Sequence, residues 1–116
     1  MKRGSLLILL ASAGGFAIAM PASAQTYRNG NDLLGDCSAS RDVCVSYVMG
    51  VVDAIVFQQR IVTRKKFLCI PGDTTSGRLA DIVMDYLRER PENRRWSAAL
   101  LVNNALVAAF PCQPEE

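Results

Sequence analysis

Apolar and polar positions alternate with a helical period over much of the chain, and the period is plainest between residues 75 and 91. Apolar residues fall there at i, i+3, i+4, i+7 and i+8, which places them along one face of a helix. They are Leu79, Ile82, Val83, Tyr86 and Leu87. Charged residues occupy the other faces, and Asp73, Thr74 or Thr75 is expected to cap the first turn. Pro91 ends this helix, because a residue before proline avoids the α-helical conformation.

The longest apolar stretch, residues 41–60, predicts a second helix. Ser38 or Ser40 is positioned to cap it, and Asp42 in the first turn complements the positive end of the helix dipole. Apolar residues cover most of its circumference, which is typical of a helix surrounded by others. A buried strand is the alternative, but this stretch exceeds the length of ordinary strands. We therefore expect residues 41–60 to form the central helix.

Two further helices complete the predicted fold. A short one covers residues 31–36, with Asn31 or Asp32 as its cap. The last one starts with Pro91 at its first position and is closed by Pro111. Its buried side is predicted to consist of Ala99, Val102, Leu106, Ala109 and Phe110. The sequence thus predicts an all-α fold, a small disulfide-bridged bundle of about four helices whose neighbours run antiparallel.

Residues 1–24 have the features of a secretory signal peptide. Two basic residues, Lys2 and Arg3, precede an apolar run that ends in small residues suited to cleavage. An uncleaved membrane anchor is the alternative, but glycines and a proline break the run, and its apolar core is shorter than the roughly 20 residues that a span needs. We expect cleavage after Ala24, which leaves residues 25–116 as one helical domain with its core in residues 29–112. The mature protein is then expected in the periplasm, with no attachment to the membrane.

Removal of the signal peptide also balances the charge of the chain. The full chain has 13 Lys and Arg residues against 11 Asp and Glu residues, and Lys2 and Arg3 account for the difference. A neutral chain of this kind argues against a nucleic-acid binder. Hydrophobic residues make up 50% of the chain and aromatic residues only 7%, which suits helix packing more than an aromatic-lined ligand pocket.

All 4 cysteines follow the predicted cleavage site, and an even number in a short exported chain indicates disulfides. Zinc is the other common use, but histidine is absent and the cysteines do not form close pairs. The long helix would hold Cys44 and Cys69 about 30 Å apart, whereas a disulfide needs Cα atoms within about 7 Å. Cys37 is tethered near Cys44 and is equally unable to reach Cys69. We therefore predict the bridges Cys37–Cys44 and Cys69–Cys112.

The residue types that most catalytic sites need are missing. Without histidine, Ser-His-Asp and Cys-His sites are excluded, and bridged cysteines cannot act as nucleophiles. Asp81 and Asp85, one helical turn apart, are the remaining candidates for proton transfer. We favour a solvated face on which Arg78 and Arg88 pair with these carboxylates. The sequence therefore predicts a protein that is not an enzyme and that holds neither a metal nor a cofactor.

A stripe of small and polar residues, Ser46, Gly50 and Asp53, interrupts the apolar helix 41–60. One interpretation is a surface on which a partner or a second protomer packs closely against Gly50 while Asp53 accepts hydrogen bonds. The other is a face that touches a neighbouring helix of the same chain, with Asp53 satisfied internally. We favour the contact within the chain, because a buried carboxylate without a partner is costly.

Basic residues form two clusters, which the predicted topology places at opposite ends of the bundle. One cluster consists of Arg60, Arg64, Lys65 and Lys66. The other consists of Arg88, Arg90, Arg94 and Arg95, and Trp96 follows it directly. Favourable charge at helix C-termini explains both clusters most simply. An exposed arginine-rich turn that ends in tryptophan also has the composition of a protein-binding hot spot, so residues 88–96 are a candidate contact loop.

Five short pieces of sequence occur in a fixed order along the chain. They are residues 29–34 (NGNDLL), residues 44–53 (C-x(2)-Y-x(2)-G-V-V-D), residues 69–71 (CIP), residues 86–92 (YL with RPE) and residues 105–112 (AL with FPC). Together they resemble the Rap/Tai family of amidase immunity proteins. The resemblance implies a periplasmic helical protein that binds a peptidoglycan-cleaving amidase delivered by a type VI secretion system and occludes its active-site cleft. It implies no catalysis, and it implies that dimers and an inserted loop occur among family members.

Two other functions compete with this interpretation. A periplasmic chaperone of the acid-stress type is also small, helical and bridged, and it exposes apolar surface when its subunits separate at low pH. The lack of histidine argues against it, because only carboxylates are left to sense acid. An exported helical protein with another binding target is the remaining alternative.

Overall fold

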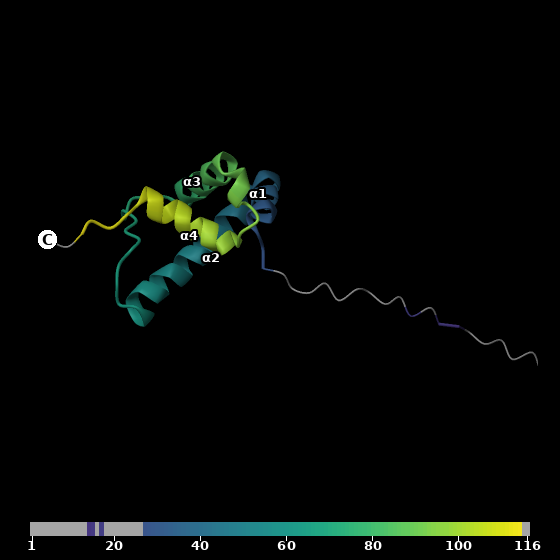
Figure 1. Ribbon diagram of the computed structural model, residues 1–116, viewed down its shortest axis with the longest axis horizontal. Helices are drawn as coiled ribbons and strands as arrows, with labels where there is room; N and C mark the ends of the chain where they lie inside the picture. Colours follow the sequence, from purple (N-terminus) through teal and green to yellow (C-terminus); the bar gives the residue numbers. More distant parts are fainter. Residues whose placement is uncertain (1–13, 16, 18–26, 115–116) are drawn as a thin grey trace, which may run out of the picture.

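The computed structural model describes residues 14, 15, 17 and 27–114, and residues 27–114 form a bundle of helices (Figure 1). The α-helices in residues 27–114 are α1 (Gly30–Ala39), α2 (Arg41–Phe57), α3 (Ser76–Glu89) and α4 (Ala98–Ala109). Two short segments, η1 (Gln58–Val62) and η2 (Pro91–Asn93), follow α2 and α3. The all-α fold class is therefore confirmed. The predicted cleavage site after Ala24 and nearly all of the predicted signal peptide lie outside the described residues.

Helix α1 begins earlier and ends later than the sequence predicted. Its cap is Asn29, whose side chain accepts a hydrogen bond from the backbone N–H of Asp32 at 3.0 Å. The Asp32 carboxylate accepts one in return from the backbone N–H of Asn29, also at 3.0 Å. This reciprocal pair satisfies two helix-end donors at once, so the predicted caps at Asn31 and Asp32 were wrong.

Helix α2 starts where it was expected and continues into a π-helical turn. The Ser40 hydroxyl accepts a hydrogen bond from the backbone N–H of Val43 at 3.4 Å, which confirms one of the two predicted caps. Segment η1 then extends the same helical rod to Val62. Figure 1 shows the far end of this rod projecting beyond the other helices.

The loop after η1 is folded back by one buried side chain. The Gln59 side-chain oxygen accepts hydrogen bonds from the backbone N–H groups of Phe67 and Leu68, both at 2.7 Å. Gln59 is the buried polar side chain of the described core, and these two bonds satisfy its oxygen. Between Gln59 and Phe67 the chain reverses direction at Arg64, whose backbone is left-handed with φ of 53°.

Helix α3 has the clearest division between a buried and an exposed face. The Thr75 hydroxyl accepts a hydrogen bond from the backbone N–H of Arg78 at 3.1 Å, which selects one of the three predicted caps. Its buried residues are Leu79, Ala80, Val83, Met84 and Leu87. Ile82 and Tyr86, which the sequence placed in the buried stripe, are only half-buried because the face is turned toward Ala80 and Met84.

Helix α4 begins later than predicted. Pro91 opens the short turn η2 instead of α4, and the chain runs through residues 94–97 before α4 starts at Ala98. The buried residues of α4 are Ala98, Leu101, Val102, Ala105 and Leu106. The predicted burial of Ala99 and Ala109 was therefore wrong, since the later start places both on the exposed side.

Two disulfides close the bundle with the pairing that the sequence predicted. Cys37–Cys44 joins α1 to α2, with a Cα–Cα distance of 4.4 Å. Cys69–Cys112 joins the loop before α3 to the segment after α4, with a Cα–Cα distance of 5.0 Å. Beside the second bridge, the backbone N–H of Cys69 donates to the carbonyl of Phe110 at 3.0 Å. The segment before α3 and the segment after α4 are thus joined both by the disulfide and by a backbone hydrogen bond.

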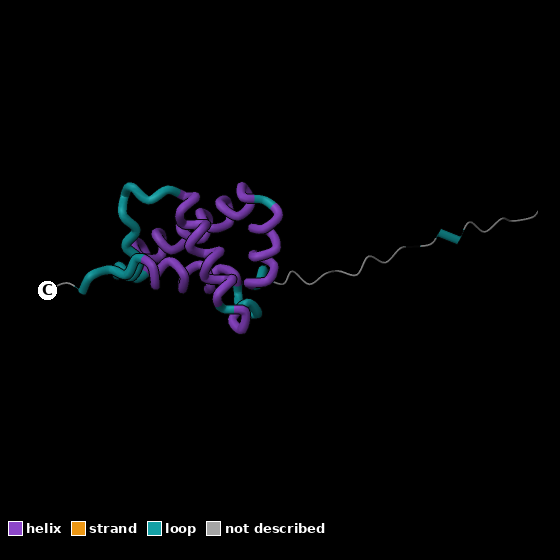
Figure 2. The backbone as a smooth tube through the Cα atoms, turned by 90° about the horizontal axis from the view of Figure 1, so that it is seen from above, coloured by secondary structure: helices purple, strands orange, loops and turns teal. Residues whose placement is uncertain are grey.

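The core lies among the four α-helices, all of which contact one another. Figure 2 shows these helices packed together as one bundle. Its largest fully buried side chains are Leu33, Val48, Val83, Leu87, Leu101, Val102 and Leu106. Helix α2 was expected to be surrounded, but only one side of it packs on the bundle, and Val43 and Phe57 of α2 and Ile61 of η1 are exposed. By length and composition alone Arg41–Val62 is apolar enough to span a membrane, a test that core helices of soluble proteins also pass.

Candidate binding surfaces

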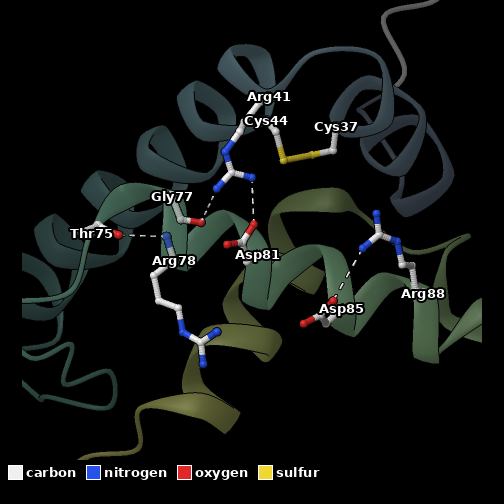
Figure 3. Close-up of polar contacts among 9 residues, drawn as sticks. All are labelled: Cys37, Arg41, Cys44, Thr75, Gly77, Arg78, Asp81, Asp85 and Arg88. Carbon is white, nitrogen blue, oxygen red and sulfur yellow. Dashed lines mark hydrogen bonds and ion pairs between the residues drawn. A yellow bond between two sulfur atoms is a disulfide. The ribbon is translucent and has the colours of Figure 1, made fainter.

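A charged groove lies between the first turns of α2 and the exposed face of α3 (Figure 3). Its volume is about 510 Å³. The residues that line it are Cys37, Ser38, Arg41, Cys44, Arg78, Asp81, Met84, Asp85 and Arg88. The Cys37–Cys44 bridge forms part of its wall and fixes Arg41 relative to α1. We call this surface the charged groove.

Arginines hold both carboxylates of the charged groove. Arg41 Nη1 lies 2.8 Å from Asp81 Oδ1, and Arg41 Nη2 donates to the Gly77 carbonyl at 3.3 Å. Arg88 lies 3.6 Å from Asp85, one turn away on the same helix. The predicted partner of Asp85 is confirmed, whereas Asp81 pairs with Arg41 of α2 and not with Arg78.

The ion pair with Arg41 fixes the charge state of Asp81. The hydrogen bond from Arg41 lowers the pKa of the Asp81 carboxyl below its ordinary value, and desolvation opposes this only in part. The same contact raises the pKa of the Arg41 guanidinium. Asp81 is therefore ionised at neutral pH and has no proton to donate, which argues against the carboxylate pair as an acid–base site.

Arg78 is the cation of the groove without an ion pair inside the described part of the chain. In Figure 3 its guanidinium points away from Asp81. It also lines a second hollow of about 460 Å³ between the start of α3 and the end of α4, together with Ile82 and Phe110. Across residues 27–114 no group of three acidic, cysteine or histidine side chains is placed to hold a metal.

The second candidate surface is the 90–97 turn, which contains most of the predicted contact loop. Arg90 lies over the ring of Tyr86 at 4.2 Å and also pairs with Glu89 at 3.4 Å. Arg95 is exposed, and Trp96 keeps 43% of its surface exposed. Arg88 lies apart from these residues and lines the charged groove. The predicted basic cluster is thus divided between two neighbouring surfaces.

The 90–97 turn is held against the start of α1 by backbone hydrogen bonds. Gly30 N–H donates to the Trp96 carbonyl at 3.0 Å, and Asn31 N–H donates to the Arg94 carbonyl at 3.1 Å. Ala98 N–H donates to the Arg28 carbonyl at 2.7 Å. The helix-end donors of α1 thereby find acceptors, and the turn gains a fixed position. Sequence reasoning missed this docking, although a glycine at position 30, directly after the capping residue Asn29, was a signal for it.

Arg94 differs from the other arginines of the turn. Its side-chain Nε is buried and has no hydrogen-bond partner, while its backbone carbonyl serves α1. Its part in the turn is therefore structural, and Arg95 and Trp96 are the residues that this surface presents to solvent.

The third candidate surface is the stripe on α2. Ser46, Gly50 and Asp53 are all exposed, and no heavy atom outside the helix lies within 4 Å of a Cβ added at Gly50. The favoured interpretation of a contact within the chain was therefore wrong, because this side of α2 faces no other helix. At the end of the rod, Arg60, Arg64, Lys65 and Lys66 are exposed, and we call them the basic tip. Figure 1 shows the segment of the basic tip at the opposite end of the bundle from the 90–97 turn.

A comparison with protein families decides what kind of molecule carries these surfaces. The family model of Rap1a immunity proteins matches residues 29–112, a span that contains all three surfaces. The chain belongs to this family. The resemblance that the sequence motifs indicated is thereby confirmed, and Rap1a membership implies a protein that binds a secreted effector protein.

Immunity proteins such as those of the Rap1a family are generally not enzymes. Searches of curated proteins and of solved structures return no match to the chain. The choice among the three surfaces therefore rests on the geometry of this Rap1a-family chain itself.

Proposed function

We propose that the chain is a periplasmic immunity protein that binds a peptidoglycan-cleaving amidase delivered by a type VI secretion system. It occludes the active-site cleft of the amidase and has no enzymatic activity of its own. Family membership supports the general role of binding a secreted effector. The two disulfides and the predicted signal peptide support a compartment outside the cytoplasm, where such bridges persist.

The observation that carries the choice of contact surface is the fixed, exposed 90–97 turn. Backbone hydrogen bonds from Gly30 and Asn31 hold it on α1, and Ala98, which follows the turn, bonds to Arg28 just before α1. A turn that is already ordered loses little conformational entropy on binding, so more of its contact energy contributes to affinity. Neither the charged groove, whose arginines are largely occupied by its own carboxylates, nor the stripe on α2 projects a fixed turn of this kind.

The side chains of the 90–97 turn suit insertion into a concave cleft. Trp96 is a large amphipathic side chain of the type enriched in binding hot spots, and Arg95 offers several donors beside it. Arg90 is held over Tyr86 and so stiffens the base of the turn. Together they form a rigid projection with one aromatic anchor.

The test measures inhibition of type VI amidases by the mature chain. A panel of such amidases is assayed for release of peptidoglycan fragments, and we expect the chain to inhibit at least one at near-equal molar ratio. Trp96→Ala should weaken that inhibition by about 30-fold or more, because a central aromatic anchor contributes about 2 kcal/mol or more. Isothermal titration of the same pair gives the affinity directly.

The matched control is Lys65→Ala in the basic tip, which removes an exposed side chain at the other end of the molecule. It should leave inhibition unchanged. Inhibition of no amidase in the panel would contradict the proposed function, and inhibition that survives Trp96→Ala would place the contact elsewhere.

A further inference from the structure

The rod formed by α2 and η1 ends in three exposed apolar side chains. Phe57, Ile61 and Val62 are 60%, 62% and 65% exposed. Spacings of four and five residues correspond to one turn of an α-helix and of a π-helix, so the three side chains lie on the same side of the rod. Figure 1 shows this end of the rod beyond the other helices. We call these three residues the apolar ridge.

Positive charge surrounds the apolar ridge in the sequence. Arg60 of the basic tip lies within η1, and the other three cations follow in the next loop. None of the four makes an ion pair within residues 27–114, and residues 54–72 contain no Asp or Glu. The acidic residues nearest to the tip in the C-terminal segment are Glu115 and Glu116, which follow Pro114. The basic tip outnumbers these two acids, so this end of the molecule is positive.

A hollow of about 300 Å³ lies between the rod and the loop that returns from it. Arg60 and Lys66 line it together with Gln59, whose amide nitrogen donates no hydrogen bond within residues 27–114. Its apolar walls are Val56, Leu68 and Ile70. Two cations and an amide donor beside apolar carbon suit a ligand that is anionic at one end and apolar next to it.

A bilayer of anionic phospholipids presents both parts of such a ligand over a whole surface. We propose that the apolar ridge and the basic tip dock on an anionic phospholipid bilayer, with a headgroup phosphate in the hollow between Arg60 and Lys66. The apolar ridge enters the boundary between headgroups and acyl chains. The basic side chains bind phosphates around it, because their long stems let the charged ends stay at the wet surface.

The form of the tip favours a bilayer over a protein partner. A protein partner needs a pocket shaped for each projecting side chain, whereas a fluid bilayer closes around any apolar projection. The apolar ridge stands on a projecting end with cations beside it, and none of these cations is fixed by a carboxylate of the described chain. Mobile cations suit phosphates that are themselves mobile.

Docking through the tip departs from the prediction that the mature chain makes no attachment to the membrane. That prediction followed the loss of the signal peptide, whereas a ridge of three residues gives reversible binding at the surface and not a span. The 90–97 turn lies at the opposite end of the bundle and stays open to an effector (Figure 1). Docking requires only a compartment bounded by anionic lipid, and it does not depend on inhibition of an amidase.

The first test is co-sedimentation of the mature chain with vesicles at low ionic strength. We expect binding to vesicles of equal parts phosphatidylglycerol and phosphatidylcholine, little binding to pure phosphatidylcholine, and weaker binding as salt is added. Arg64→Gln with Lys65→Gln should lower the partition coefficient by about 25-fold, since each basic residue near an anionic surface contributes about fivefold. Ile61→Ser with Val62→Ser should lower it by about 10-fold or more, because less apolar surface enters the bilayer.

Each pair of substitutions has a matched control elsewhere on the surface. Arg78→Gln with Arg95→Gln removes the same charge from two exposed arginines that make no ion pair within residues 27–114. Val43→Ser with Leu100→Ser removes two apolar side chains that are 49% and 46% exposed. Both controls should bind vesicles as the wild type does. All these side chains are exposed, so the circular dichroism spectra should not change.

The second test reports the depth of the apolar ridge. Ile61→Cys is labelled with a fluorophore whose emission shifts to the blue in an apolar environment, and Leu100→Cys is labelled in the same way as the control. We expect a blue shift on the mixed vesicles at position 61 and none at position 100.

Equal binding to charged and uncharged vesicles, or controls that weaken binding as much as the tip variants, would overturn the proposal. So would a label at position 61 that stays in water. Displacement by inorganic phosphate at the concentration of the lipid headgroups would reduce the site to one for free phosphate, and sedimentation with purified peptidoglycan but not with vesicles would assign the tip to the cell wall. Amidase inhibition in solution is measured separately on the same variants and should not change, so failure of one assay leaves the other interpretable.

Discussion

Gly30 lies in the first turn of α1, directly against the backbone of Arg94. A Cβ at this position would come within 2.8 Å of Arg94 Cα and 2.9 Å of the Arg94 carbonyl oxygen. The backbone of Gly30 is not left-handed, so the requirement is for space and not for conformation. Backbone atoms cannot move aside as a flexible side chain can. A single missing methyl group thus allows the 90–97 turn to dock on α1.

We expect Gly30→Ala to destabilise the fold by about 1–3 kcal/mol, the usual cost of overpacking a tight site. A thermal melt should show the loss, and hydrogen exchange should show faster exchange at the amides of Asn31 and Ala98. Gly35→Ala on the same helix is the control, because its surroundings are open and alanine favours the helix. Equal melting temperatures for Gly30→Ala and the wild type would mean that the turn adapts freely.

Asp81 and Arg41 make the ion pair for which the structure resolves a pKa shift. Because the folded-state pKa of Asp81 is lowered, its contribution to stability is present above the ordinary carboxyl pKa of 3.8 and is lost as the pH falls through the lowered value. We therefore expect the gap in melting temperature between wild type and Asp81→Asn to be constant near neutral pH and to close in acid. In an Arg41→Gln background the same substitution should have almost no pH-dependent effect. A gap that does not change with pH would contradict this account.

At the scale of whole elements, local patterns predicted those parts that local forces decide. Helix α3 was predicted nearly to its ends because its amphipathic stripe and its threonine cap are adjacent in sequence. The start of α4 was missed because Pro91 is a permissive start signal, while the actual boundary is set by hydrogen bonds to residues 28–31, far away in the chain. The open side of α2 was missed for the same reason, since an apolar circumference does not tell which neighbours are present.

For the candidate surfaces too, the sequence did not reveal contacts between distant parts of the chain. Composition identified Arg95 and Trp96 as an exposed basic and aromatic pair, and the structure places them on a fixed turn. Composition could not identify Arg41 as the partner of Asp81, because the two residues lie on different helices. It also could not show that Arg94 turns its side chain inward.

At the scale of the whole molecule, two disulfides hold the bundle together. Cys37–Cys44 closes a short loop between consecutive helices, with a sequence separation of 7. Cys69–Cys112 closes a loop with a separation of 43 that contains all of α3 and α4. In the chain-entropy model a longer closed loop removes more freedom from the unfolded chain. The two bridges should therefore differ in their contribution to stability.

We expect the second bridge to stabilise the fold more, by about 4 kcal/mol against about 2.5 kcal/mol for the first. Replacing both cysteines of a bridge by serine avoids a stray thiol, so Cys69→Ser with Cys112→Ser is compared with Cys37→Ser with Cys44→Ser. Urea unfolding of the mature chain should give the larger loss for the first pair. The Phe110 carbonyl bond to Cys69 will retain part of the local geometry without the sulfurs, which keeps the folded reference comparable. The opposite order would show that Cys37–Cys44, which forms the wall of the charged groove beside Arg41, stabilises native contacts beyond its short loop.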